Sequence, residues 1–249
     1  MARLRCLSFN IWKNEGDYPR RMSAIAALLR EIQPDVVALQ ECFVAAELQI
    51  DSARTVAGTG YHLTRYPARA KLRLHEGAWM DSRSDMVILS RLSPLAQGRV
   101  ALPCDPRDGE RGLLWGDLPI AGGVRVGCIH LTHLRDATAQ GVRVQQAAAV
   151  MAALRSTPAP AILMGDFNAP ANDPTLEAIF DHPVLCPTAR DFSKAPAGDE
   201  APGNGAIDHV LLFASPEQGR MVSRRIVAAP DLSGHPSDHP ASLADIEIF

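Results

Sequence analysis

Several apolar runs in this chain end in a carboxylate, an amide or a histidine, the side chains that most often bind metals or move protons. The stretch PAILMGDFNAP (160–170) shows the pattern: an apolar run stops at a glycine, and Asp166 and Asn168 follow with Phe167 between them. Alternate residues of a strand share a face, so we expect Asp166 and Asn168 to point together and Phe167 to turn into the core. The same residue types follow other apolar runs: Asn10, Glu41, His133, Asp208 and the cluster Ser237, Asp238, His239.

Oxygen donors without thiolates suit a hard divalent cation, Mg²⁺ or its usual substitute Mn²⁺. Mg²⁺ is typically held by one or two carboxylates, and Glu41, helped by Asn10, fits that role. Zinc is the alternative, because the chain holds two histidine pairs at ligand-like spacing, His130 with His133 and His235 with His239. Positions i and i+3 of a strand face opposite sides, which disfavours the first pair. The sequence holds no G-x-S-x-G and no G-x-x-x-x-G-K-[ST], which argues against a serine nucleophile elbow and P-loop chemistry.

The length and composition allow one folded domain or two small ones, and we expect a single domain over 1–249. The chain has 249 residues, of which 47% are hydrophobic, enough for a large core. No apolar run reaches 18 residues, and MARLRCLSFN predicts a first strand rather than a secretory leader. The net charge of −3 gives no general attraction to nucleic acid. Five cysteines without a C-x-x-C predict free thiols and a cytoplasmic location.

Strand-length apolar runs alternate with helical patterns. Helices are expected at 18–33, 43–57 and 137–155, and a Pro- and Gly-rich loop at 191–204. Strands are expected at 4–9, 35–41, 61–66, 84–90, 111–118, 124–134, 160–168, 206–213 and 240–249. The halves echo each other, since REIQPDVVALQE and RSTPAPAILMGDFN both place a proline and a buried strand before acidic residues. This alternation predicts an α/β or α+β fold with two stacked sheets that each contribute polar strand ends to one cleft.

Two features keep alternatives open. TRYPARAKLRLH (64–75) carries four basic residues and fits either a solvated loop or edge strand or a phosphate-contacting loop. Trp12, directly after the first strand, fits either core packing or a cleft wall.

Eight short motifs occur here in the order seen in the endonuclease/exonuclease/phosphatase superfamily, the deoxyribonuclease-I-like phosphoesterases. They are SFNIW, PDVVALQE, ILSR, THL, R-x-x-Q, GDFN, IDHV and SDH. The resemblance runs from residue 4 to 249 and implies a four-layer α/β/β/α sandwich, with two mostly antiparallel sheets packed face to face and helices outside. His209 stands where an aromatic residue is common, and we interpret it as structural.

The resemblance also implies roles for particular residues. Glu41 is implied as the principal Mg²⁺ ligand, with Asn10 as a ligand or orienting amide and Asp238 as a further ligand. His239 resembles the general base, with Asp208 holding its ring. Asp166 and Asn168 would orient the nucleophile, and His133 would stabilise developing charge. Asn168, His133 and Arg111 are implied to bind substrate.

We therefore predict a Mg²⁺-dependent phosphoesterase that hydrolyses a phosphodiester or a phosphomonoester by in-line water attack. The alternative is an inactive family member acting as a binding module, which would normally have lost the metal glutamate or the base histidine; both are present here. The substrate class stays open among nucleic acid, lipid headgroup and small phosphate ester. Loops 65–83, 102–112 and 190–205 are expected to set specificity, and no protein partner is inferred.

Overall fold

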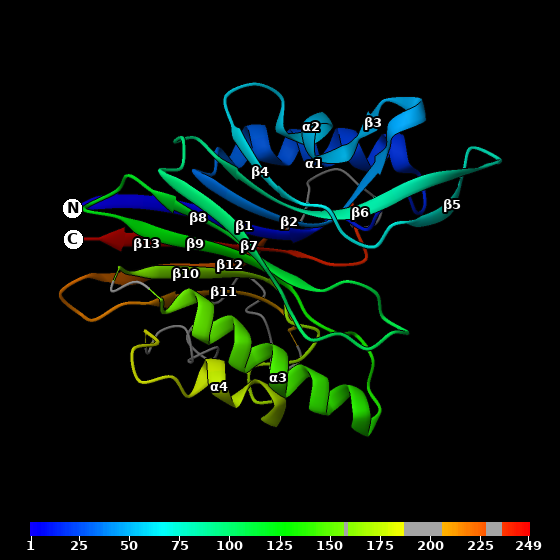
Figure 1. The fold of residues 1–249 in the computed structure, drawn as a ribbon. Coiled ribbons are helices and arrows are strands. Elements are labelled where there is room, and N and C mark those ends of the chain that lie inside the picture. Colours follow the sequence, from blue (N-terminus) through cyan, green and yellow to red (C-terminus); the bar gives the residue numbers. More distant parts are fainter. Residues whose placement is uncertain (157–158, 187–205, 228–235) are drawn as a thin grey trace.

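The strands of the protein form two sheets that pack face to face between helices (Figure 1). The computed structural model describes residues 1–156, 159–186, 206–227 and 236–249. The larger sheet has the order β12-β13-β1-β2-β6-β4, with β3 paired to β2 and β5 to β6, and the smaller has the order β11-β10-β9-β8-β7. The first sheet comprises β1 (Ala2–Asn10), β2 (Val36–Ala45), β3 (Ile50–Asp51), β4 (His62–Tyr66), β5 (Lys71–His75), β6 (Ala78–Ser90), β12 (Gly219–Val227) and β13 (Ala241–Ile248). The second comprises β7 (Ala96–Ala101), β8 (Gly112–Leu118), β9 (Val124–His130), β10 (Ala161–Asp166) and β11 (Asp208–Phe213).

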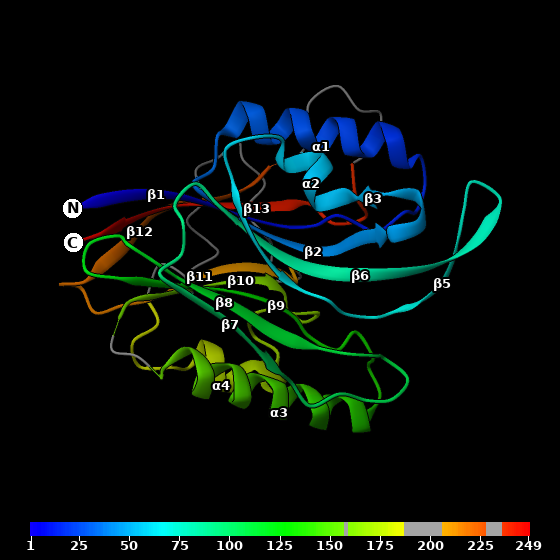
Figure 2. The same ribbon diagram turned by 45° about the horizontal axis from the view of Figure 1, so that its top comes forward.

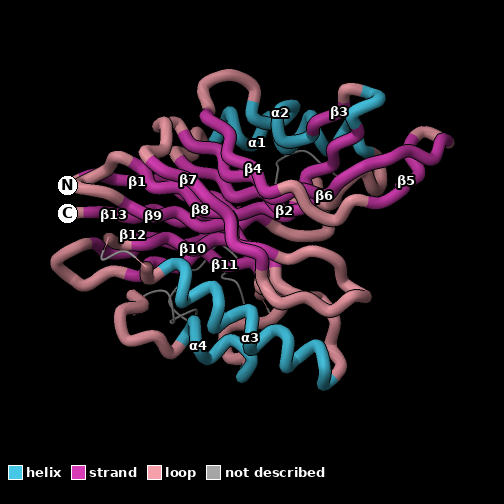
Figure 3. Tube along the Cα trace, viewed as in Figure 1, coloured by secondary structure: helices cyan, strands magenta, loops and turns pink. Residues whose placement is uncertain are grey.

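The helices cover the outer faces of the two sheets. They are α1 (Tyr18–Ile32), α2 (Ser52–Ala57), α3 (Ala137–Leu154) and α4 (Glu177–Phe180), with short 3₁₀ turns η1 (Ala46–Leu48) and η2 (Pro174–Leu176). In Figure 3 the cyan helices lie above and below the magenta strands, with α1 and α2 on one side and α3 and α4 on the other. The predicted four-layer α/β/β/α sandwich is therefore confirmed.

Each sheet contains one parallel pair built by a strand–helix–strand unit. β1 and β2 are parallel and joined through α1, while β9 and β10 are parallel and joined through α3. Every other strand pair in the described part of the chain is antiparallel. The sequence echo between the halves thus corresponds to the same local unit repeated once per sheet.

Capping residues set the limits of the two long helices. The Asp17 side chain accepts a hydrogen bond from the Arg20 N–H, and Gln33 closes α1 in the left-handed conformation before Pro34. Asp136 accepts from the Ala139 N–H at the start of α3. These limits match the expected helices at 18–33 and 137–155 to within a residue.

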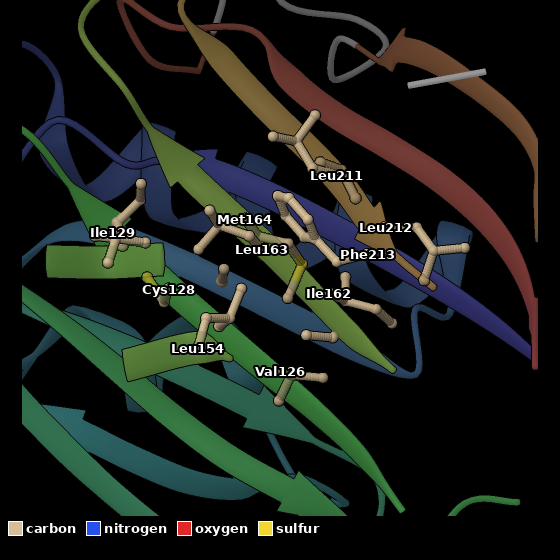
Figure 4. Close-up of a cluster of buried hydrophobic side chains, with 14 of the residues drawn as sticks. Val126, Cys128, Ile129, Leu154, Ile162, Leu163, Met164, Leu211, Leu212 and Phe213 are labelled. Atoms are coloured by element: carbon tan, nitrogen blue, oxygen red, sulfur yellow. The ribbon is translucent and has the colours of Figure 1, made fainter. Parts of the chain in front are cut away.

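Alternating side chains separate the core into layers. On β1, Cys6 belongs to the cluster between the sheets, while Leu7 belongs to the cluster beneath α1. Figure 4 shows part of the first cluster, where Cys128 on β9, Met164 on β10 and Leu211 on β11 lie among other buried apolar side chains.

The helix expected at 43–57 is wrong over its first half. β2 continues to Ala45, and only Ser52–Ala57 is α-helical. The local helix propensity of Ala45, Ala46 and Glu47 is overridden because Phe43 and Ala45 are fully buried beside Met80 of β6. The strand expected at 124–134 ends earlier, at His130.

Four strands were not expected from the sequence. These are the two-residue β3, β7, β12 and β5, which pairs with the start of β6 in a hairpin that projects from the body of the protein (Figure 2). The basic stretch 64–75 runs through β4 and β5, so it is edge strand rather than loop for most of its length.

The loop predicted at 191–204 lies outside the described residues, as does the expected specificity loop at 190–205. Within the described ranges no helix has the length and apolar character needed to cross a membrane.

Candidate active site

One polar cavity collects side chains from both sheets. It has a volume of about 220 Å³ and is lined by Asn10, Lys13, Glu41, Arg69, His130, His133, Asp166, Asn168, Asp238 and His239. β1 and β2 of the large sheet and β9 and β10 of the small sheet each contribute, as the strand-end pattern predicted. A larger cavity of about 530 Å³ lies between α1 and the α2–β4 connection, but its lining includes no carboxylate and no histidine.

An antiparallel strand pair brings two carboxylates together at this cavity. Asp166 is the last residue of β10, Asp208 is the first of β11, and the two are register partners. His239 Nδ1 lies 2.7 Å from Asp208 Oδ2, while its Nε2 lies 3.8 Å from Asp166 Oδ2. The imidazole is therefore held by one carboxylate and presents its other nitrogen toward the second, the arrangement of an oriented acid–base histidine.

Burial and charge shift the pKa values of this group. Burial, reinforced by the charge of Asp208, raises the pKa of Asp166 to about 7. Burial alone lowers the pKa of His239, but its hydrogen bond to Asp208 and the negative charges of Asp208 and Asp166 outweigh that effect and raise it to about 9. Asp166 therefore titrates near neutral pH, whereas His239 stays protonated there unless positive charge is placed beside it.

Glu41 owes its position to a break in the ladder between β2 and β6. The register shifts between Leu39 and Cys42, and Glu41 within that bulge has a φ of 57°. A bulge re-aims a side chain that regular alternation would place elsewhere. Glu41 was expected at the end of its strand, but it lies inside β2 and reaches the cavity because of the bulge.

Strained backbone concentrates around the cavity. Four of its lining residues have left-handed φ values although none is glycine: Lys13 at 44°, Glu41 at 57°, Arg69 at 51° and Asn168 at 53°. Such conformations cost free energy and persist where the surrounding structure fixes them, most often at functional sites.

The GDFN segment departs from simple strand alternation. β10 ends at Asp166, so Asn168 reaches the cavity through its left-handed conformation, with its N–H bonded to Asp166 Oδ1 and its amide donating to the Leu131 carbonyl. Phe167 is fully buried, as predicted. Gly165 is required because its φ is 151° and any Cβ there would collide with the carbonyl oxygen of Ile129.

The loop that carries His133 is fixed from α3. Arg143 donates to the carbonyls of Thr132 and Leu134, and Gln146 accepts from the Thr132 N–H. This contact set explains the R-x-x-Q spacing. His133 Nδ1 lies 2.6 Å from the buried carboxylate of Asp108, so this histidine also has a carboxylate behind it.

Arg21 secures the segment that follows β1. Its guanidinium donates to the carbonyls of Ile11, Trp12, Lys13, Glu15 and Pro236. The Trp12 ring stacks on Arg21, 5.0 Å from the guanidinium carbon, and does not line the cavity. Ser237 anchors the SDH segment by donating to the Asn10 carbonyl at 2.6 Å. A charged residue on the apolar stripe of α1 is the sequence signal that could have revealed Arg21.

Several side chains offer oxygen atoms for a divalent cation. Glu41 and Asp238 present carboxylates to the cavity, and Asn10 donates its amide to Asp166 Oδ2 while its oxygen accepts from the Trp12 N–H. Both polar atoms of the Asn10 side chain therefore have partners within the protein. The donors fit a hard cation, as expected. Asp166, Asp208 and His239 also lie within 4.8 Å of one another and could hold a metal ion, although His239 Nδ1 already contacts Asp208 Oδ2.

The remaining residues that the sequence suggested for the site do not all line the cavity. His130 and His133 both reach the cavity, because His133 lies beyond the end of β9, but they lie next to different carboxylates, Asp166 at 3.4 Å and Asp108 at 2.6 Å. His235, half of the second zinc pair, lies outside the described residues. Arg111 does not line the cavity: it is buried behind His133 and paired with Asp108.

His209 lies on the opposite face of β11 from Asp208. Its ring packs edge-on against Phe167 and Phe180 at centroid distances of 4.9 and 5.1 Å. This supports the interpretation of His209 as structural. The sequence analysis missed the cavity position of Lys13 and, apart from the zinc alternative, that of His130; Arg69 belongs to the stretch for which a phosphate-contacting loop was one alternative.

Comparison with known sequences settles the family. A profile of the Endonuclease/Exonuclease/phosphatase family matches residues 7–239. The chain belongs to this family. No curated protein sequence matches significantly.

Solved structures share the fold of this family member at low sequence identity. An endonuclease/exonuclease/phosphatase from Beutenbergia cavernae is 23% identical with a TM-score of 0.72, covering 99% of this chain and 72% of its own. TDP2 from D. rerio, solved with a single-strand DNA product, is 16% identical with a TM-score of 0.75, covering 99% and 100%. A mannosyl-6-phosphatase from Bacteroides thetaiotaomicron is 20% identical with a TM-score of 0.69, covering 99% of each chain.

Proposed function

We propose that residues 1–249 form a single domain that hydrolyses a phosphoester bond with the help of a divalent cation, Mg²⁺ by preference. The observation that carries the proposal is the joint arrangement of an oriented histidine, His239, and a separate carboxylate, Glu41, in one small polar cavity. Hydrolysis of a phosphate ester needs both a base for water and positive charge for the phosphoryl oxygens.

Each catalytic residue is assigned a step that its contacts support. His239 Nε2 takes the proton from the attacking water while Asp208 holds Nδ1, which fixes the tautomer. Asp166 and Asn168 orient the water and the phosphoryl group from the end of β10. His133, backed by Asp108, stabilises charge on the phosphate or the leaving oxygen.

The cation would be held by Glu41 and Asp238, with Asn10 keeping Asp166 in place. When bound there it would neutralise phosphoryl charge and offset the carboxylates that raise the pKa of His239, favouring the unprotonated imidazole that a base requires.

The printed names of the structural neighbours support the phosphoester class without choosing a substrate. One was solved with a DNA product and another is called a mannosyl phosphatase. Both are under 25% identical to this chain, so the substrate class has to be inferred from the cavity of this protein.

Turnover assays with a chelator control test the proposal. We expect p-nitrophenyl phosphate or bis(p-nitrophenyl) phosphate to be hydrolysed with Mg²⁺ or Mn²⁺ and not with EDTA. Replacing His239 with alanine should lower the rate by roughly 10²–10⁴-fold, whereas His62→Ala, at an exposed position of β4, should leave it unchanged. Absence of metal-dependent turnover across nucleic acid, phospholipid and sugar-phosphate substrates would support the inactive binding module instead.

A further inference from the structure

Arg69 is a mostly buried cation without a hydrogen-bond acceptor. Its side chain is 19% exposed, and within the described ranges its guanidinium makes no hydrogen bond. The nearest carboxylate oxygen, Oε1 of Glu41, lies 4.0 Å away. The backbone is nevertheless fixed, because the Arg69 N–H donates to Glu110 and its carbonyl accepts from Arg73. A guanidinium has five N–H donors, and leaving them unused in a partly desolvated place is costly.

Further positive charge surrounds the same part of the cavity. Lys13 is 21% exposed and its Nζ lies 2.9 Å from Oε2 of Glu41. Burial, together with the nearby positive charge of Arg111, lowers the pKa of Arg69. Arg111 itself has a buried Nη1 with no partner among the residues that the structure describes. The carboxylates of Glu41, Asp108 and Glu110 offset part of the repulsion between these cations, and an anion that reached both Arg69 and Lys13 would offset more of it.

Glu41 cannot supply that neutralisation alone. Its single negative charge faces two cations, Lys13 and Arg69, and the proposed metal ion would use the same carboxylate. An anion in the cavity would therefore replace Glu41 as the partner of both. The volume of about 220 Å³ has room for a phosphoryl group.

We propose that Arg69 and Lys13 form a binding site for the non-bridging oxygens of a terminal phosphate, which makes this protein selective for dianionic phosphomonoesters over monoanionic phosphodiesters. This inference rests on the proposed function for its catalytic consequence, but the anion site itself does not. A terminal phosphate has three non-bridging oxygens, enough for a cation and the two side chains together. The planar fork of Arg69 suits two of these oxygens at once.

Phosphate binding without metal tests the site independently of catalysis. Inorganic phosphate is titrated into the protein in EDTA, by calorimetry or ³¹P NMR, for wild type, Arg69→Met and Lys71→Met. Lys71 is an exposed cation of the same basic segment and is absent from the cavity lining, so its replacement matches the charge change. We expect the dissociation constant to rise at least about tenfold in Arg69→Met and to stay unchanged in Lys71→Met. Equal affinity in all three proteins, or no binding in any, would overturn the inference.

Substrate discrimination tests its catalytic consequence. With Mg²⁺ present, kcat/KM is measured for p-nitrophenyl phosphate and bis(p-nitrophenyl) phosphate. Arg69→Met should lower the monoester value by about 10- to 100-fold and the diester value far less, and Arg69→Lys should restore part of the loss. Equal losses on both substrates would refute selectivity for the dianion. If wild type binds phosphate through Arg69 but turns over no phosphoester, the anion site stands and the proposed enzymatic function fails.

Discussion

Replacing His209 with glutamine should remove a specific acid sensitivity of the fold. The His209 ring is fully buried, with Nε2 3.2 Å from the Ala169 carbonyl and Nδ1 3.2 Å from the guanidinium of Arg224. Only the neutral ring satisfies both contacts, because Nε2–H donates to the carbonyl while Nδ1 accepts from the arginine. Burial and the charge of Arg224 accordingly lower the pKa of His209 to about 3.

The size of the effect follows from proton linkage. A histidine in the unfolded chain has a pKa of about 6.5, so between pH 6.5 and about 3 the unfolded state binds a proton that the folded state refuses. The stabilisation is complete above pH 6.5 and is lost as the pH falls. From pH 7.5 to 5.0 the loss attributable to His209 is about 2 kcal/mol, at ~1.36 kcal/mol per pH unit of full linkage.

Urea unfolding at the two pH values in EDTA measures this contribution. Glutamine can accept from Arg224 and donate to Ala169 but cannot titrate, so the stability difference between wild type and His209→Gln should shrink by about 2 kcal/mol on acidification. The buried neutral His130 also makes the fold less stable on acidification, but both proteins contain it, so its contribution cancels from the stability difference. A difference that stays constant between pH 7.5 and 5.0 would refute the buried-neutral assignment of His209.

Three further substitutions test the catalytic unit, the cation site and the loop support. Asp208→Asn should lower kcat by at least roughly 10²-fold, since the amide no longer stabilises the imidazolium, and unchanged kcat would separate Asp208 from the mechanism. Glu41→Gln should weaken Mg²⁺ or Mn²⁺ binding by at least about tenfold in calorimetry, and unaltered affinity would place the cation elsewhere. Arg21→Met should lower the free energy of unfolding by about 3 kcal/mol, because five carbonyls lose a charged donor. The control Arg20→Met, on the exposed side of α1, should change the free energy of unfolding by less than about 0.5 kcal/mol. Equal effects of the two arginine substitutions in urea unfolding would contradict the stabilising role of the hydrogen bonds from Arg21 to these carbonyls.

Local patterns specified the elements that contain the site. Apolar periodicity and the prolines that follow located α1 and α3 closely, because an amphipathic stripe and the proline after it are encoded in neighbouring residues. The echo between the halves identified the repeated strand–helix–strand unit for the same reason. The helix expected at 43–57 failed where burial of Phe43 outweighed local propensity.

The sequence identified which residues have side chains suited to the site, but not which of these side chains contact one another. The sequence by itself determined that Glu41, Asp166, Asp208 and His239 were present in the family order. Tertiary structure decided that Asp166 and Asp208 face each other, since strand register depends on pairing between segments far apart in the chain.

Tertiary structure also decided where the charges meet. The bulge in β2 aims Glu41 between Lys13 and Arg69, which come from two different connections. In sequence, Arg69 was one of four basic residues in a stretch that fitted either a solvated loop or edge strand or a phosphate-contacting loop. Folding buries it without an acceptor beside Lys13, because burial and charge proximity arise only when distant segments pack together.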